Sequence, residues 1–437
     1  MTKKHYANWP KDYQDPSWFT HDRFGMFIHF GLFSLAARHE WIMTTEQITP
    51  ADYKRYFDHF DPDQLDIAGW LDQAVEAGMK YVVLTTKHHE GFALWNSQLT
   101  SYKVTETPFE KDIVQFFVDE ARKRQLKIGF YYSLIDWHHK DFTLDGLHPL
   151  RENQFARDTK DQRQMRNYRE YLKGQITELL TNYGPIDYMW YDFSYPHRDW
   201  GWSKGKGNLD WDGEGIENLT RSLQPHILIN DRLDLNRGVK TPEQYQPHHP
   251  IVEDGKPVLW EACQTMNESW GYDKYNANWK SVDQILKMLV DTVSKNGNFL
   301  LNIGPTARGA IDDLTKERLD GIKVWMKKHE RSIVGCEPSD FISPLDCRLT
   351  QKDDRLYVHI FSWPYRHIHL KDLQGKVCYA QFLHDRSEVF IEEFDRNQVI
   401  TSTETHIEAG DIVLNLPVIK PDVAIPVIEL FITDNRP

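Results

Sequence analysis

Cysteine is scarce in this sequence, and the pattern of the few that occur excludes two classes of protein. Cys263, Cys336, Cys347 and Cys378 form no Cys-X-X-Cys pair in a chain of 437 residues. Pairs at that spacing are typical of zinc ribbons and thioredoxin-like redox sites, so neither is predicted. Four cysteines in a chain of this length also do not make the dense disulfide framework of a small secreted domain.

Long apolar runs and an excess of basic residues are also missing. No stretch approaches the ~18 apolar residues of a membrane-spanning helix, and no apolar segment follows the lysines near the N-terminus. The formal net charge of −13 disfavours nucleic acid and anionic membrane surfaces as partners. We therefore expect a cytoplasmic protein that binds neither nucleic acid nor membrane. The sequence allows a homo-oligomer but does not specify one.

Short β-rich runs alternate with segments of helical periodicity through about residue 335. The runs cover residues 26–30, 81–85, 128–132, 188–191, 227–230, 258–260 and 299–303. Apolar strands that alternate with helices are typical of an α/β fold with a parallel sheet, and at this length a (β/α) barrel of the TIM type is favoured. A doubly wound open sheet is the alternative, but no Gly-X-Gly-X-X-Gly turn follows the first run.

The pattern changes after about Pro338, where strands follow one another without helices. These later strands are expected at residues 356–361, 381–383, 389–391, 411–416 and 427–432. Turn residues separate them, which predicts a small antiparallel β-sandwich. We therefore expect a catalytic barrel over residues 1–337 and a C-terminal sandwich over residues 338–437, the second supporting the first by packing.

A single carboxylate ends the fourth predicted strand. Residues 188–191 are apolar or aromatic and lead directly into Asp192, with Trp190 two positions before it. In a barrel of parallel strands, a side chain at the C-terminal end of a strand points into the active-site mouth. A helix N-cap would explain the same aspartate without any chemistry.

Other polar side chains fall at the ends of the predicted strands in the same way, and loops at one face of a barrel would bring them together. They are His29, His88, His89, Tyr131, Tyr132, Arg232, Glu243 and Glu261. The histidines raise the question of a metal. A strand-borne metal site favours His-X-His, because alternate residues share a face, whereas His88–His89 and His138–His139 are adjacent. We therefore predict no metal and no other cofactor.

Paired carboxylates and abundant aromatic rings are the side chains of glycoside hydrolysis. In retaining enzymes one carboxylate attacks the anomeric carbon and the other shuttles the proton. Asp192, on a rigid strand, is the predicted nucleophile. The candidates for the proton shuttle are Glu243, Glu253 and Glu261, and spacing does not choose among them. Arg232 would hold a carboxylate ionised or clamp a substrate hydroxyl, unless it forms a structural ion pair.

These residues resemble the retaining α-L-fucosidases of glycoside hydrolase family 29. The resemblance runs from about Trp18 to Gly335, and more loosely through the C-terminal strands. The matching stretches are 23–31 (RFGMFIHFG), 40–41 (EW), 86–92 (TKHHEGF), 129–133 (GFYYS), 136–137 (DW), 190–192 (WYD), 230–232 (NDR), 260–263 (WEAC), 269–272 (SWGY) and 298–305 (NFLLNIGP).

The resemblance implies a cofactor-free retaining exo-α-L-fucosidase that removes terminal α-L-fucose from oligosaccharides or glycoconjugates. It implies Asp192 as the nucleophile and Glu243 as the acid/base, with Glu261 as the second candidate for that role. The implied substrate-binding residues are His29, Glu40, Trp41, His88, His89, Trp190, Arg232, Glu261 and one of Tyr131 and Tyr132. Phe30, Phe33 and Ile42 depart from the commoner residues of the family near the substrate, which leaves the aglycone preference open.

Two other functions stay open at this point. A catalytically silent fucose-binding protein would lack one of the two carboxylates, but both candidates are present. A metal-dependent hydrolase on a similar barrel would be favoured by the histidine content, and a chelator would abolish its activity.

Overall fold

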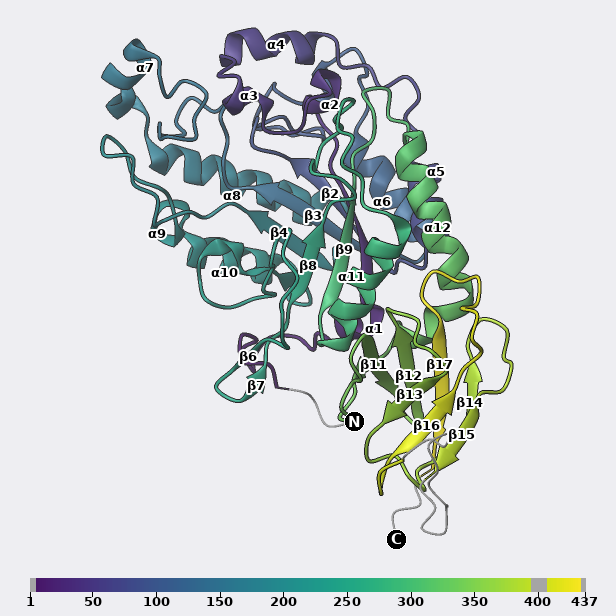
Figure 1. The fold of residues 1–437 in the computed structure, drawn as a ribbon. Helices are drawn as coiled ribbons and strands as arrows, with labels where there is room; N and C mark the ends of the chain where they lie inside the picture. Colours follow the sequence, from purple (N-terminus) through teal and green to yellow (C-terminus); the bar gives the residue numbers. More distant parts are fainter. Residues whose placement is uncertain (1–4, 394–406, 434–437) are drawn as a thin grey trace.

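A curved parallel sheet forms the centre of the computed structural model, which describes residues 5–393 and 407–433 (Figure 1). Its strands lie in the order β5-β4-β3-β2-β1-β9-β8, and every neighbouring pair is parallel. The strands are β1 (Phe24–Ile28), β2 (Tyr81–Lys87), β3 (Lys127–Ser133), β4 (Tyr188–Asp192), β5 (Leu228–Ile229), β8 (Glu261–Gln264) and β9 (Asn298–Ile303).

Helices cover the outer face of this sheet, so most strand residues are buried on both sides. Every residue of β2, β4 and β9 is buried, as the continuous apolar runs of the sequence indicate. The main helices are α5 (Ile67–Glu76), α6 (Ile113–Lys123), α8 (Met165–Asn182), α10 (Gly213–Leu223), α11 (Val282–Ser294) and α12 (Asp313–His329). Side-chain caps begin several of them: Asp312 accepts from the Thr315 amide, and Ser281 with Gln284 forms a capping box.

Shorter elements surround the ends of the strands. They are α1 (Ser17–Asp22), α2 (Phe33–Ala36), α3 (Ile42–Thr45), α4 (Pro50–Asp58), α7 (Gln154–Asp158), α9 (Asn208–Trp211), the 3-10 turns η1 (Val104–Glu106), η2 (Lys160–Gln162), η3 (Asp231–Leu233) and η4 (Glu330–Ser332), and the hairpin β6 (Val252–Glu253) and β7 (Lys256–Pro257). Across the described residues, no helix is both long enough and apolar enough to cross a membrane.

The expected barrel is confirmed only in part, because β5 and β8 do not pair with each other and the regular sheet is not closed. The segment 239–243 occupies the gap between them. Val239 forms a parallel bridge to Asn230, after β5, while Lys240 and Glu243 bridge to residues 260 and 263 around β8. Single bridges, not a regular ladder, therefore link the two edges of the sheet.

The sixth strand begins later than the sequence predicts. The apolar run at 258–260 lies before β8, and pairing with β9 starts only at Glu261, opposite Asn298. The residues before it bond instead to the bridging segment, because Lys240 donates its amide to the Leu259 carbonyl at 2.9 Å. Glu261 therefore begins its strand, where the sequence had placed it at the end.

The C-terminal strands form two antiparallel sheets around a second apolar core, which confirms the predicted fold class of this part. One sheet has the order β10-β11-β12-β17-β14 and the other β13-β16-β15. Their strands are β10 (Glu337–Pro338), β11 (Cys347–Lys352), β12 (Arg355–Ile360), β13 (His367–Leu370), β14 (Val377–Phe382), β15 (Phe390–Glu393), β16 (Ile412–Asn415) and β17 (Val427–Ile432). Leu356, Leu414 and Leu430 lie in the core between the sheets.

The core around the parallel sheet extends into these C-terminal strands. Tyr357, Ile425 and Val427 belong to the same apolar cluster as the helices of the N-terminal part. Trp325 of α12 is 2% exposed and donates its indole N–H to the Ile425 carbonyl at 2.9 Å. The two parts are therefore packed together through α12, as Figure 1 shows.

Truncation of Trp325 tests this shared core. Trp325→Ala removes a buried indole and leaves a carbonyl without its donor, so we expect the free energy of unfolding to fall by about 3–5 kcal/mol. Trp202→Ala, at a half-buried surface position, serves as the matched control and should cost under about 1 kcal/mol. Urea denaturation of both variants measures the difference, and equal losses would contradict the shared core.

Candidate active site

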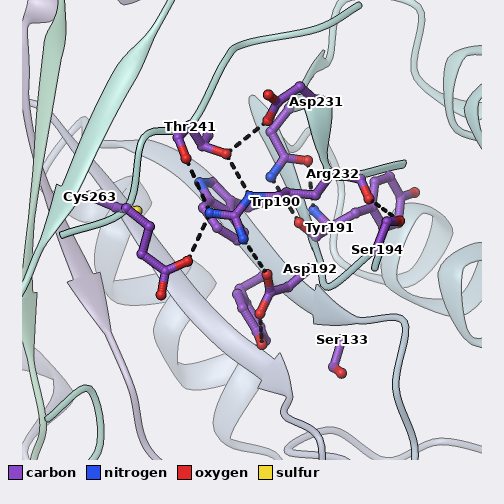
Figure 2. A network of polar contacts seen from close by, with 12 residues as sticks. Ser133, Trp190, Tyr191, Asp192, Ser194, Asp231, Arg232, Thr241 and Cys263 are labelled. Atoms are coloured by element: carbon purple, nitrogen blue, oxygen red, sulfur yellow. Dashed lines mark hydrogen bonds and ion pairs between the residues drawn. The ribbon is translucent and has the colours of Figure 1, made fainter. Parts of the chain in front are cut away.

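Asp192 is the last residue of β4 and lies opposite Ser133 of β3 at the C-terminal edge of the sheet (Figure 2). Alternation along the strand turns Trp190 and Asp192 to the inner face. Tyr191 points the other way and bonds to Thr220 of α10 at 2.6 Å. The next residue, Phe193, has a φ of 82°, a left-handed backbone that is strained for a bulky side chain. The chain therefore turns sharply at the carboxylate.

Two donors hold the Asp192 carboxylate in one orientation. Tyr131 donates its hydroxyl to Oδ2 at 2.7 Å, and Arg232 donates Nη1–H to Oδ1 at 3.0 Å. Burial raises the pKa of Asp192 to about 6, while Arg232 opposes this shift and the charge of Glu243 adds to it. Asp192 is therefore an ionised, fixed carboxylate above that pH.

Arg232 also binds the second carboxylate. Its Nη2 lies 2.9 Å from Glu243 Oε2, and its Nε donates to Thr241 Oγ1 at 2.8 Å. Figure 2 shows the guanidinium between Asp192 and Thr241, above the ring of Trp190, whose centroid is 5.0 Å away. The Asp192 side chain is 11% exposed and that of Glu243 39%. One carboxylate therefore lies deep in the site and the other at its mouth.

Three histidines line the same site and are neutral at neutral pH. His29 Nδ1 lies 2.6 Å from Asn302 Oδ1, and His89 Nδ1 lies 2.7 Å from Ser133 Oγ. His88 stacks on Tyr131 with ring centroids 5.4 Å apart. Burial lowers the pKa of His29 and His89 well below 6.5 and that of His88 to about 3. They can therefore exchange hydrogen bonds with hydroxyl groups without adding charge.

A cavity with about 310 Å³ of empty space lies between these groups. Apolar rings and a few polar groups line it, as in most small-molecule sites. The predicted site residues that line it are His29, Trp41, His88, His89, Tyr131, Trp190, Asp192 and Glu243. Its lining therefore suits a ligand with both an apolar edge and hydrogen-bonding groups.

The described residues contain no group of three or more His, Cys, Asp and Glu side chains arranged to hold a metal ion. The second pair of adjacent histidines packs against aromatic rings. His138 stacks on Tyr102 with centroids 3.8 Å apart, and His139 lies 4.4 Å from the ring of Tyr171. Neither lines the cavity beside Asp192.

Glu40 lies behind the wall of the cavity and not in it. Its Oε2 accepts hydrogen bonds from the amides of Trp270 and Gly271, at 3.1 and 2.8 Å, and burial raises the pKa of Glu40 to about 7. The loop that carries Trp270 and Gly271 packs closely against Gly304. A Cβ at position 304 would lie 2.8 Å from the Tyr272 amide nitrogen, so the close approach requires glycine. Glu40 thus holds the loop that presents Trp270.

Two further candidates for substrate binding, Tyr132 and Glu261, also do not line the cavity. Tyr132 follows Tyr131 on β3 and so faces outward, where its hydroxyl donates to Gln175 of α8 at 2.8 Å. Glu261 begins β8, and its fully buried carboxylate accepts from Tyr81 Oη at 2.5 Å and Trp190 Nε1 at 3.2 Å. Of the two open alternatives, strand alternation therefore places Tyr131 at the cavity, and the expected position of Glu261 is corrected, because it supports Trp190 from the inner side of the sheet.

The structure also brings in side chains to which the sequence gave no role. Phe27 lines the cavity and lies two residues before His29, so strand alternation was a usable signal for it. Phe193, Cys263 and Trp270 line it as well, and Thr241 holds Arg232. Trp270 and Thr241 lie outside the regular strands, where no periodic pattern identifies the face that a side chain takes.

Comparisons with known proteins agree with this geometry. A family model described as alpha-L-fucosidase matches residues 2–331. Tissue alpha-L-fucosidase of Mus musculus is 30% identical over 378 residues, which are 80% of this chain and 78% of the mouse protein. The chain belongs to the α-L-fucosidase family. This membership confirms the enzymatic activity expected from the sequence, hydrolysis of α-L-fucosides.

Solved structures of the α-L-fucosidase family share this fold along most of the chain. Alpha-L-fucosidase isoenzyme 1 from Paenibacillus thiaminolyticus is 42% identical with a TM-score of 0.87, over 96% of this chain and 99% of that one. A family 29 fucosidase from Bacteroides thetaiotaomicron, trapped as a covalent intermediate with 2-fluoro-fucosyl fluoride, is 24% identical with a TM-score of 0.81, over 98% of each chain.

Adjacent tyrosines test which side chain serves this fucosidase site. Tyr131→Phe removes one oxygen that donates to the Asp192 carboxylate, so we expect kcat/KM to fall about 10- to 100-fold. Tyr132→Phe removes the hydroxyl oxygen of the neighbouring tyrosine, which faces away from the cavity. Its kcat/KM should stay within about threefold of the wild-type value. Steady-state hydrolysis of 4-nitrophenyl α-L-fucoside compares them, and similar losses in the two variants would refute the assignment.

Proposed function

We propose that this protein is a retaining exo-α-L-fucosidase with Asp192 as the nucleophile and Glu243 as the acid/base. The observation that carries the proposal is that one guanidinium, Arg232, binds both carboxylates at the edge of a cavity. Asp192 is deep and fixed, as a positioned nucleophile requires. Glu243 is at the mouth, where a leaving group would depart.

The reaction then follows two displacements. Asp192 attacks the anomeric carbon while Glu243 gives its proton to the departing oxygen, which leaves a fucosyl ester on Asp192. Glu243 next takes a proton from water, and the resulting hydroxide displaces Asp192 and releases fucose. The covalent intermediate of the Bacteroides relative supports this order of steps.

The cavity favours a single terminal sugar. Its small volume and its aromatic wall suit a compact ring with one apolar edge, such as the C5 methyl group of fucose against Phe27, Trp190 or Trp270. The neutral rings of His29, His88 and His89 suit the hydroxyl groups. Fucosylated oligosaccharides are therefore the proposed substrates, with short di- and trisaccharides preferred if the enzyme is cytoplasmic, as we propose from the sequence. Faster hydrolysis of intact glycoproteins than of short glycans would argue against that preference.

We also propose that the segment 239–243 acts as the eighth member of a closed barrel. Its bridges to both edges of the sheet support this, and so does the position of Glu243 on it. We propose a barrel domain over residues 1–337 and a sandwich domain over residues 338–437. We also propose that the protein can form a homo-oligomer. The pairing of β10, at residues 337–338, with β11 supports a boundary at this point.

Two alternatives predict different behaviour. A catalytically silent fucose-binding protein would bind fucose without turnover, but the paired carboxylates argue for turnover. A metal-dependent hydrolase would lose activity with a chelator, and the histidines of the cavity are instead bonded to Asn302 and Ser133 or stacked on Tyr131.

Azide separates the roles of the two carboxylates. Asp192→Ala and Glu243→Ala should each lower kcat on 4-nitrophenyl α-L-fucoside by at least about 10³-fold. Azide should rescue Asp192→Ala with β-fucosyl azide as the product, because it replaces the nucleophile directly. It should rescue Glu243→Ala with α-fucosyl azide, because it intercepts the fucosyl enzyme. Glu261→Gln is the control and should yield no azide product. Near-normal turnover by Asp192→Ala would falsify the mechanism.

The pH dependence tests the ionisation of the nucleophile. The pKa of Asp192 is raised to about 6, and only the ionised form attacks. We therefore expect the acid limb of kcat/KM to fall about tenfold per pH unit well below pH 6. Because the charge of Glu243 contributes to this shift, Glu243→Gln should move the acid limb to lower pH. A wild-type profile that stays level down to pH 5 would contradict the prediction.

A further inference from the structure

Two of the site histidines are bonded through Nδ1 to a polar side chain at the end of a strand. Asn302, near the end of β9, places Oδ1 2.6 Å from His29 Nδ1. Ser133, at the end of β3, places Oγ 2.7 Å from His89 Nδ1. All four side chains are buried. The tautomer of each imidazole therefore depends on which partner atom carries a hydrogen.

The orientation of the Asn302 amide is fixed by its other contact. Nδ2 donates to the Trp270 carbonyl at 2.7 Å, and a carbonyl oxygen can only accept. Oδ1, which has no hydrogen, must then face His29. The hydrogen between them belongs to His29 Nδ1, so His29 Nε2 carries a lone pair and no hydrogen.

Ser133 leads to the same result by a different route. Its hydroxyl has one hydrogen, and Oγ lies 2.7 Å from the Ile135 carbonyl, which can only accept it. Oγ also accepts from the Ile135 amide at 3.0 Å. Toward His89 it can therefore only accept, so His89 Nδ1 carries the hydrogen and Nε2 the lone pair.

The lone pair of His89 faces another acceptor. Nε2 lies 3.8 Å from Asp192 Oδ2, a distance at which no hydrogen bond joins them. A hydroxyl group that donates to Nε2 suits this arrangement, because two acceptors facing each other need a donor between or beside them. Burial, which lowers the pKa of His29 and His89 well below 6.5, keeps both rings neutral, so the lone pairs are available at neutral pH.

We propose that Asn302 and Ser133 are positioning residues that lock His29 and His89 in the Nδ1–H tautomer, so that both present Nε2 as an acceptor to hydroxyl groups of the bound sugar. The inference rests on the proposed function, which places the sugar in this cavity. It sets a rule for the substrate: the hydroxyls at these two positions must donate a hydrogen. His88 is not locked in this way, since among the described residues its Nδ1 has no hydrogen-bond partner.

Substrates that lack one hydroxyl separate this role from a structural one. Asn302→Leu and Ser133→Ala are assayed on 4-nitrophenyl α-L-fucoside and on its 2-, 3- and 4-deoxy analogues. Each variant should lose about tenfold in kcat/KM on the parent and less than about twofold on one analogue, the one without the hydroxyl that the histidine accepts. A loss of the same size on all four substrates would overturn the proposal.

Asn298 offers a matched control on the same strand. Its Nδ2 donates to the Phe19 carbonyl at 2.7 Å, as Asn302 does to Trp270, and within residues 5–393 and 407–433 no hydrogen bond joins it to a histidine. Asn298→Leu should lower thermal stability as Asn302→Leu does, with the same fractional activity on every substrate. If Asn302→Leu does not fold, Asn302→Asp replaces it. This variant keeps the acceptor, and its negative charge should favour protonated His29 and move the acid limb of kcat/KM to higher pH.

Nitrogen NMR reports the tautomers without turnover. With ¹⁵N-labelled histidine, Nδ1 of His29 and His89 should show a bound proton and Nε2 none, with His29→Gln and His89→Gln for assignment. The Nδ1 proton of His89 should be lost or shared in Ser133→Ala. A protonated Nε2 in the wild type would overturn the proposal even if the enzyme hydrolyses fucosides. Inactive wild type with the expected tautomers would instead count against the proposed function.

Discussion

The contact of one guanidinium with two carboxylates is the constraint on which the rest of the site depends. Arg232 binds Asp192 through Nη1 and Glu243 through Nη2, and Thr241 holds it through Nε. A charge that leaves water needs such partners, because an unpaired buried carboxylate or guanidinium costs several kcal/mol. The end of β4, the turn η3 and the segment 239–243 must therefore lie where one planar side chain can reach them all.

Buried carboxyl groups outside the Asp192–Arg232–Glu243 contact are satisfied in another way. Glu261 accepts from Tyr81 and Trp190, and Glu40 accepts from two backbone amides. Burial still raises the pKa of Glu40 and of Glu261 to about 7 and that of Glu90 to about 8. Near neutral pH these groups are therefore only partly ionised. Glu40 and Glu261 hold the loop of Trp270 and the ring of Trp190 with less negative charge near Asp192 than fully ionised carboxylates would add.

The sequence predicts those parts of the site that follow from strand periodicity. An apolar run that ends in Asp192 locates the proposed nucleophile, and His29, His89 and Arg232 lie at or shortly after the ends of other predicted strands. Strand periodicity fails at Glu261, because the chain near 258–260 bonds to the segment 239–243 and β8 starts three residues later than predicted. The sequence alone does not distinguish Tyr131 from Tyr132, because the choice depends on which face of β3 points toward the inside of the sheet. The sequence does not predict the role of residues 239–243 beside the sheet. This segment pairs through isolated bridges, and such pairing does not require the apolar alternation of a regular strand.

The shared guanidinium also fits the two opposite tasks of the proposed acid/base. In the free enzyme Asp192 and Glu243 share one cation, and the charge of Glu243 raises the pKa of Asp192 while Arg232 lowers it. In the proposed mechanism the charge of Asp192 is lost when the fucosyl ester forms. Arg232 then has Glu243 as the one carboxylate of this pair that still carries a charge, and Glu243 is the group that must take a proton from water in the second step. A cation bound to Asp192 alone would orient the nucleophile but would make no contact with the proposed acid/base in either step.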